Sequence, residues 1–237
     1  MNRRHLLAGL ALTGVRARAQ TQPSEAPGKS LYIPKPQLVE DRRFLHDFMD
    51  EFAFVDLVTV SPSLRITHIP VWLDRSAGAY GTIHGHISRQ NPQNSTFDGK
   101  QTGVIVFHGP HSYISPTWYS KNEVVPTWNF AVVHASGKLS AITDKKALHD
   151  LLAKLIHKFE TSPTSSYDFA KLPDSYTYSL MAGIIGFQLE IELLEGKFKL
   201  GQDRSEVDRQ GILKGLQSAK TEQSIYDFTA AFYKRSV

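Results

Sequence analysis

Seven short runs rich in β-branched and aromatic residues lie between residues 54 and 142, and they constrain the fold more than any other feature. Gly, Pro, Asn, Asp or Ser bounds each run, which predicts a meandering antiparallel sheet, and seven short strands favour a barrel. The runs are Phe54–Val60, Ile66–Leu73, Gly81–Ile87, Gly103–His108, Ser112–Ser115, Asn129–Ala135 and Gly137–Ile142. The absence of βαβ alternation and of a Gly-x-Gly-x-x-Gly turn argues against a Rossmann nucleotide site.

Helical patterns flank this strand-rich region. Apolar residues recur at three- and four-residue spacing over Asp41–Phe54, with Asp41 as the N-cap, and over Asp144–Phe159. Further on, the patterns predict a polar loop over 161–176, a helical turn over Tyr176–Met181, a half-buried strand over Ile184–Leu194, and helices over 205–216 and 221–233. We therefore expect one mainly β domain with flanking helices (α+β) over residues 31–237.

The first 19 residues are organised as an export signal. Arg3-Arg4 precedes an apolar stretch from Leu6 to Val15 and the small-residue pattern Ala17-Arg18-Ala19. The apolar stretch is only about half of the ~20 residues that a transmembrane helix needs. Because the arginine pair resembles a twin-arginine signal, we expect cleavage, a periplasmic or otherwise exported chain, and no membrane insertion afterwards. Residues 20–30 would form a flexible linker. The alternative is a loose basic tail.

The amino-acid composition excludes several classes of function. The chain has no cysteine, which excludes a disulfide framework, a thiolate nucleophile, an iron–sulfur cluster and a cysteine-ligated zinc. The net charge of +4 is a property of the N-terminus, because residues 1–19 hold four arginines and no acidic residue, whereas the rest has 23 basic and 23 acidic residues. The mature chain thus lacks the basic excess of a nucleic-acid-binding protein, and we expect no nucleic-acid partner.

Two histidines of one predicted strand invite a metal hypothesis. His84 and His86 are two residues apart, so their side chains project from the same face. Additional ligands would come from His68, His108, His111 or His134. The segment lacks the glutamate that follows His-x-His in cupins, and we predict no metal site. The alternative is that these histidines form hydrogen bonds within a polar strand face.

The segment Ser88-Arg89-Gln90-Asn91-Pro92 leaves the strand and is expected to start a helix at Pro92. A guanidinium with neighbouring hydroxyl and amide groups suits a phosphate, although a solvated surface arginine would look the same in sequence. Two aromatic segments follow, Pro116-Thr117-Trp118-Tyr119 and Pro126-Thr127-Trp128-Asn129-Phe130. Proline fixes the backbone while the aromatic and amide groups are presented, which favours a binding surface; core packing of Trp128 and Phe130 is the alternative.

These motifs together resemble the PaiB family of FMN-binding split-barrel proteins. The resemblance rests on segments 31–34, 85–92, 107–119, 125–130 and 195–204, in order and spacing, and covers about residues 31–216. It implies a six-stranded split β-barrel with flanking helices, a homodimer, and FMN at the subunit interface.

The resemblance also implies a set of cofactor-binding residues. They are Arg89, Ser88 and Lys199 at the phosphate, His84, His86, Asn91 and Gln202 at the ribityl chain, Trp118, Tyr119, Trp128 and the backbone near Thr127 at the isoalloxazine, and Asn129 beside them. For proton handling near a flavin edge the candidates are His86 and Tyr119.

Three positions depart from the family pattern, which commonly reads Lys-Leu-Ser-Gln-Asn-Arg near the C-terminus. Here Gly201 replaces the serine and Asp203 the asparagine, so that one donor is lost and one negative charge is added. Both changes disfavour a phosphate at this loop. Phe198 stands where the family commonly has tryptophan, a milder change.

We expect an exported FMN-binding protein. If it is an enzyme, we expect an FMN-dependent oxidoreductase of unknown substrate. One alternative is a non-enzymatic flavin carrier, or a haem-binding protein with His84, His86, His108 or His111 as axial ligand. Another is a metal-dependent enzyme that uses His84 and His86. If the signal is not used, a PaiB-type transcriptional regulator is the remaining alternative.

Overall fold

The computed structural model describes residues 28–121, 124–219 and 223–235. Eight strands are present in this part of the chain: β1 (Leu38–Val39), β2 (Phe54–Thr59), β3 (Arg65–Pro70), β4 (Trp72–Asp74), β5 (Thr82–Ser88), β6 (Asp98–Ile114), β7 (Thr127–Ile142) and β8 (Ile184–Lys199). The α-helices are α1 (Arg42–Glu51), α2 (Lys145–Phe159), α3 (Asp174–Met181), α4 (Glu206–Ser218) and α5 (Gln223–Arg235). Short 3-10 turns cover Lys35–Gln37, Pro92–Thr96, Pro116–Trp118 and Phe169–Lys171.

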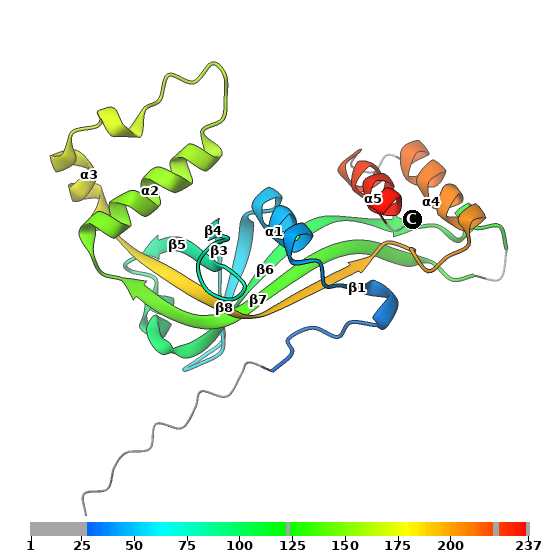
Figure 1. The fold of residues 1–237 in the computed structure, drawn as a ribbon, viewed down its shortest axis with the longest axis horizontal. Coiled ribbons are helices and arrows are strands. Elements are labelled where there is room, and N and C mark those ends of the chain that lie inside the picture. Colours follow the sequence, from blue (N-terminus) through cyan, green and yellow to red (C-terminus); the bar gives the residue numbers. More distant parts are fainter. Residues whose placement is uncertain (1–27, 122–123, 220–222, 236–237) are drawn as a thin grey trace, which may run out of the picture.

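The strands form one antiparallel sheet in the order β3-β2-β6-β7-β8-β5-β4, with β1 paired to β8. The first and last strands of this order, β3 and β4, are separated along the chain only by Val71. The sheet must therefore curl until its two ends meet at that residue, which produces a half-closed, split barrel (Figure 1). The predicted class, mainly β with flanking helices, is confirmed.

Three strands are longer than predicted: β8 continues beyond Leu194 to Lys199, and β6 and β7 each join two predicted runs. The runs Gly103–His108 and Ser112–Ser115 belong to the single strand β6, because an irregularity in register at Gly109 and Pro110 absorbs two turn-forming residues without ending the pairing with β7. The last two predicted runs likewise join in β7. There a Cβ on Gly137 would lie 1.8 Å from the carbonyl oxygen of Glu190, so that only glycine allows β8 to pair so closely.

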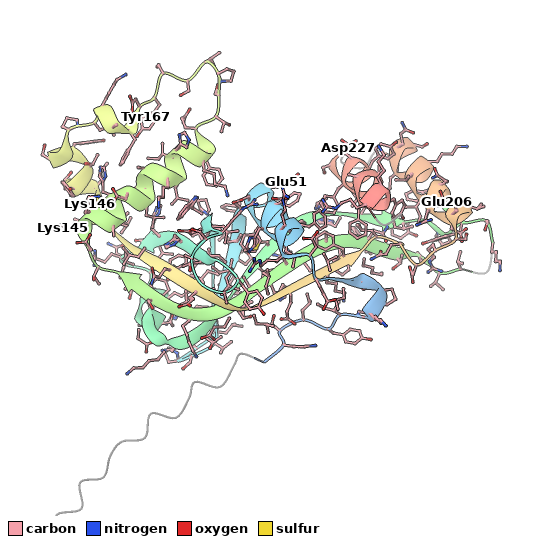
Figure 2. The ribbon with its side chains drawn as sticks, in the orientation of Figure 1. Glu51, Lys145, Lys146, Tyr167, Glu206 and Asp227 are labelled. Atoms are coloured by element: carbon pink, nitrogen blue, oxygen red, sulfur yellow. The ribbon has the colours of Figure 1, made fainter. Side chains whose placement is uncertain are left out.

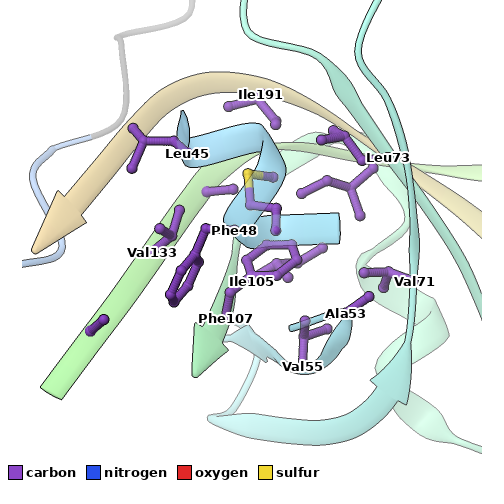
Figure 3. Packing of buried hydrophobic residues seen from close by; sticks show 14 of the residues in the cluster. Leu45, Phe48, Ala53, Val55, Val71, Leu73, Ile105, Phe107, Val133 and Ile191 are labelled. Carbon is purple, nitrogen blue, oxygen red and sulfur yellow. The ribbon is translucent and has the colours of Figure 1, made fainter. Parts of the chain in front are cut away.

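The main core lies between the concave face of the sheet and helices α1 and α5. Asp41 caps α1 as predicted, its carboxylate accepting a hydrogen bond from the Phe44 amide. Figure 3 shows Leu45 and Phe48 of α1 against Val133, Ile105 and Phe107 of the sheet. Phe198, at the end of β8, is fully buried among four other phenylalanine rings.

A second, smaller apolar cluster holds α2 and α3 at the other end of the sheet from α4 and α5 (Figures 1 and 2). Leu148, Leu151 and Leu155 of α2 pack with Met181 of α3 against partly buried residues of the sheet. The predicted helical turn at Tyr176–Met181 is the end of α3.

The predicted export signal and most of the predicted linker lie outside the described residues. Contact with the sheet begins at Ser30, whose amide and hydroxyl both donate to the Glu195 carboxylate, at 2.9 and 2.8 Å. Among the helices of the described ranges, none has both the length and the apolar character to cross a membrane.

Candidate functional site

The predicted cofactor residues fall into two groups at opposite ends of the sheet. One group lies on β5 and the turn after it, and the other lies where β6, β7 and β8 end beside α4 (Figure 1). His84 pairs with Gln188, and a strand rises about 3.3 Å per residue, so that β8 carries Lys199 roughly 35 Å further along. One chain therefore does not bring the two groups together around a single flavin nucleotide.

In the β5 group, Arg89 and Asn91 form hydrogen bonds that stabilise the local fold. Arg89 donates from Nε to the Ala182 carbonyl at 2.9 Å and from Nη2 to the Ile184 carbonyl at 2.8 Å, which ties the end of α3 to the sheet. Asn91 caps the 3-10 turn that begins at Pro92, and its Nδ2 donates to the Thr67 hydroxyl. A phosphate bound at this turn would have to displace these contacts.

A hollow lined in part by His84 has a volume in the range of small-molecule sites. This aromatic cleft, about 390 Å³ in volume, lies between α2 and the outer surface of β4, β5 and β8. The Trp72 and His84 rings form one wall, with centroids 5.2 Å apart, and Lys154 Nζ lies 4.1 Å from the Trp72 ring centre. Asp74, Asp144, Asp150 and Gln188 supply polar groups around the rim.

Burial governs the ionisation of three histidines. Burial lowers the pKa of His84, although the nearby Asp74 carboxylate opposes this, and it lowers the pKa of His86 without any opposing group. Burial also lowers the pKa of His134, against the effect of Glu195. His86 Nδ1 is buried with no hydrogen-bond partner among the described residues. Burial thus favours the neutral form of the His86 imidazole.

These shifts predict a loss of stability in mild acid. As the pH falls through the ordinary histidine pKa of 6.5, the unfolded chain takes up protons that the three folded imidazoles resist. We expect the free energy of unfolding by urea to be lower at pH 5 than at pH 8, with a smaller difference in the His86→Gln variant. Equal stability at both pH values would contradict the prediction.

The second group surrounds a small hollow of about 120 Å³ at the end of the sheet. This lysine hollow is lined by Gln37, Tyr119, Thr127, Asn129, Lys199, Gly201, Gln202, Asp203 and Arg204. Lys199 Nζ donates to the Thr127 hydroxyl and, at 2.9 Å, to the Trp128 carbonyl. Gln202 fixes the loop by accepting from the Leu200 amide at 2.9 Å and donating to the Pro36 carbonyl at 2.8 Å.

The turn at Gly201 explains one departure from the family pattern. Gly201 has a φ of +77°, and a Cβ there would lie 2.8 Å from Ile212 Cδ1. A serine at this position would be strained, so α4 and the loop are packed for glycine.

The two predicted tryptophans have different surroundings. Trp118 packs on α4, so closely that a Cβ on Gly215 would lie 2.1 Å from its indole ring. Its interpretation as a free flavin wall is therefore not supported within one chain. Trp128 is 52% exposed and stands on the outer face of the sheet with His111 and Tyr113 beside it.

That outer face carries three of the histidines named in the metal hypothesis, His68, His108 and His134, beside Asp56 and Glu195, which sequence reasoning did not single out. Strand register aligns His68, Asp56, Val106, His134 and Glu195 in one row across five positions of the sheet. Asp56 accepts hydrogen bonds from His68 Nδ1 and, at 2.9 Å, from His108 Nε2. Burial tends to raise the pKa of Asp56, but the hydrogen bonds from the two histidines outweigh it and lower the pKa. Throughout the described ranges, no three potential ligands are gathered to hold a metal ion.

The donor sets of the two hollows fit the two ends of a flavin nucleotide. The aromatic cleft offers the Trp72 and His84 rings, tilted by 35° to each other, with the Lys154 ammonium over the Trp72 ring, and aromatic side chains of this kind suit a flat heteroaromatic ring system. The lysine hollow is small and cationic, as a phosphate group requires. Because the hollows lie at opposite ends of one chain, a flavin that contacts both would need a second chain.

Comparison with known proteins places this architecture in a family. Residues 31–193 match the family described as "Putative FMN-binding domain". The "Protease synthase and sporulation protein PAI 2" of Bacillus subtilis (strain 168) is 34% identical over 189 residues, which are 79% of this chain and 90% of the relative. The chain belongs to this PaiB-like FMN-binding family. Membership supports flavin binding by this chain.

Solved structures show the same fold at low sequence identity. The flavocytochrome Anf3 from Azotobacter vinelandii has a TM-score of 0.52 at 13% identity, over 73% of this chain and 75% of that chain. The FAD and heme binding protein from Mycobacterium smegmatis has a TM-score of 0.51 at 16% identity, over 69% and 73%. The PaiB-like chain thus shares the split barrel with flavin- and haem-binding proteins.

Sequence reasoning also missed three side chains of the hollows. Trp72 lies in a predicted strand and Lys154 on the polar face of a predicted helix, so neither had a local signal. Arg204 belongs to the C-terminal motif, and its charge next to Lys199 could have marked it.

Proposed function

We propose that this chain is a periplasmic or otherwise exported FMN-binding protein that uses the flavin in an oxidation–reduction reaction. The observation that carries the proposal is the FMN-binding family match over residues 31–193, and a cleft lined by the Trp72 and His84 rings is consistent with it. The arginine pair and apolar stretch of residues 1–19 support export.

The proposed active form is a homodimer that joins two chains through their outer sheet faces. This face presents large exposed apolar side chains, among them Phe54, Ile66, Tyr113 and Trp128, which is unusual for a surface that meets only water. A two-fold axis through such a face makes each chain contribute the same patch, so that residues from opposite ends of two chains can approach one another. The aromatic cleft of one chain would then hold the ring system while the partner supplies the remaining contacts.

The chemistry divides between cofactor and protein. FMN, when bound, supplies hydride or electron transfer, and the protein positions it and tunes it. His86 is the side chain proposed to exchange a proton near the flavin, since its Nδ1 is buried without a partner among the described residues. Tyr119 is a weaker proton donor, because burial raises the pKa of its hydroxyl, although the nearby Arg204 opposes this.

The test is the visible absorption spectrum of residues 20–237 purified without added cofactor, with identification of whatever denaturation releases. We expect a flavin spectrum and released FMN. Bleaching of that flavin by NAD(P)H or a substrate supports the oxidoreductase, and no bleaching over a broad panel leaves a flavin carrier. A Soret band instead of a flavin spectrum would favour haem binding. A colourless protein that also fails to take up FMN would contradict the proposal.

The similarity to the PaiB family leaves one regulatory alternative open, the PaiB-type transcriptional regulator. A PaiB-type regulator would act on the chromosome, so it requires that the signal is not used. Detection of the full-length chain in the cytoplasm, together with DNA binding, would favour that alternative over an exported flavoprotein.

A further inference from the structure

A third hollow, of about 490 Å³, is lined by none of the predicted cofactor residues. Its volume is in the range of small-molecule sites. One wall is the segment of residues 29–33, which precedes β1 and which we call the strap (Figure 1). The other walls of this strap hollow come from β1, from the first turn of α1 and from residues 193–195 of β8. The hollow is therefore a separate candidate site.

The strap hollow follows an edge of β8 that has no strand beside it. Residues 193–195 all line the hollow, and successive side chains of a strand point to opposite faces. A hollow that touches three residues in a row therefore lies along the edge of the strand. On this edge β5 pairs with β8 as far as Glu190, and β1 pairs with residues 196 and 197. Among the described residues, no strand pairs with 192–195 on this side, and such an edge offers backbone amides and carbonyls to a ligand.

A buried carboxylate in the lining independently points to a ligand. Glu195 is only 5% exposed, and its Oε2 accepts from the Ser30 amide at 2.9 Å and from the Ser30 hydroxyl at 2.8 Å. Its Oε1 is also buried, but has no hydrogen-bond partner among the described residues. A buried acceptor without a donor costs free energy, and a donor from a ligand would remove that cost. Glu195 thus lacks one donor on the side of Oε1.

The strap is fixed to the sheet at two points. Ser30 is bound to Glu195, and Lys197 Nζ donates to the Tyr32 carbonyl at 2.8 Å. The same ammonium lies 5.5 Å from the centre of the Tyr32 ring. Both points of attachment are on β8, so the strap and the strand edge are held at a fixed separation. A site whose walls are already fixed does not have to be ordered by its ligand, which favours binding.

The other charged side chains of the strap hollow lie at its rim. Lys29, Glu40 and Arg42 are exposed, so that water and salt screen their charges. Arg42 is also engaged, because its Nη1 donates to the Ala79 carbonyl at 2.9 Å. Leucine, isoleucine and valine side chains from the strap, β1, α1 and β8 form most of the remaining wall. A ligand that fits this lining has a charged donor for Glu195 and an apolar body.

We infer that the strap hollow binds a primary ammonium group on an apolar body, with the ammonium at Glu195 Oε1. An ammonium has three donors and brings a positive charge to the buried carboxylate. The apolar body packs on the aliphatic walls. Two sources share this chemistry: a free amine, and the N-terminus of a short peptide, whose amides can also bond to the edge of β8 at 192–195. The inference uses no flavin contact and is independent of the proposed function.

The experiment titrates 3-methylbutylamine and 3-methylbutanol, which has a similar shape but no charge, into the full chain by calorimetry and ligand-observed NMR. We expect the amine to bind at least about tenfold more tightly, because hydrogen bonds between charged groups are the stronger ones. Glu195→Gln keeps the shape of the side chain and should weaken the amine at least about tenfold, but not the alcohol. Glu40→Gln removes the same charge at the exposed rim and is the matched control, with both affinities unchanged. Leu31→Trp fills the hollow and should weaken both ligands, which tests the site even if the Glu195 variant does not fold.

Three results would overturn the inference: no saturable amine binding by the wild-type chain, equal affinities for the amine and the alcohol, or a loss of amine binding in Glu40→Gln but not in Glu195→Gln. Leucine amide and leucyl-leucine amide distinguish the two sources. Tighter binding of the dipeptide amide supports a peptide that bonds to the edge of β8, and equal binding supports a free amine. A chain that binds the amine but no flavin would support the inference and contradict the proposed function, so the two can fail separately.

Discussion

Replacing Phe198 with alanine is expected to lower the free energy of unfolding by about 3–5 kcal/mol. The Phe198 ring is fully buried and lies 5.0–5.7 Å, centre to centre, from the rings of four phenylalanines on α1 and α5. Truncation would leave a cavity at the point where the end of β8 is fixed to both helices, and such a cavity cannot fill without moving them. Urea unfolding followed by tryptophan fluorescence and far-UV circular dichroism measures the change.

Phe159→Ala is the matched control, because its ring is 49% exposed at the end of α2. The same truncation should cost well under about 1 kcal/mol there, since surface substitutions are usually small in effect. A loss at Phe198 no larger than that at Phe159 would mean that the aromatic cluster does not stabilise the end of β8. Lys199 is the next residue and ends β8, and the loop with Gln202 follows it, so the Phe198→Ala variant should also lose the geometry of the lysine hollow.

The elements of this fold are readable from sequence where local periodicity is strong. The caps at Asp41 and Asp144 lie where the pattern places them, because a cap bonds only to the first turn of its own helix. The continuity of β6 was missed since Gly109-Pro110 reads as a turn, and only pairing with β7 shows that the strand carries on through it. The sequence around residues 109 and 110 gives no information about that partner strand.

The candidate site was harder to predict than the elements, because it also depends on contacts between distant parts of the chain. Arg89 has the surroundings of a phosphate ligand in sequence, but α3 and the start of β8 bring carbonyl acceptors to it from residues 182 and 184. Asp56 lies alone in sequence, and only strand register places His68 and His108 beside it. Both outcomes depend on contacts between residues far apart in the chain.

Introducing glutamate at both Phe54 and Trp128 is expected to convert a dimer into a monomer and to weaken FMN binding at least about tenfold. Both side chains are more than half exposed on the outer face, and each substitution appears twice in a two-fold interface. Four carboxylates in a contact surface would have to be desolvated without partners, which costs more than a standard-sized interface gains. Light scattering coupled to size-exclusion chromatography gives the mass, and flavin fluorescence quenching gives the affinity.

The control introduces the same charges at two other exposed positions: Tyr167, in the segment between α2 and α3 (Figure 2), and Leu180 of α3. This variant should keep the wild-type mass and FMN affinity. A wild-type monomer would contradict the homodimer. A monomeric Phe54 and Trp128 variant with unchanged FMN affinity would show that one chain holds the flavin alone, and the aromatic cleft would then be the whole site. If the cofactor is bound across two chains, the Phe54 and Trp128 variant must lose the dimer and the flavin together. The reason is that one chain alone does not bring the two groups of cofactor residues together.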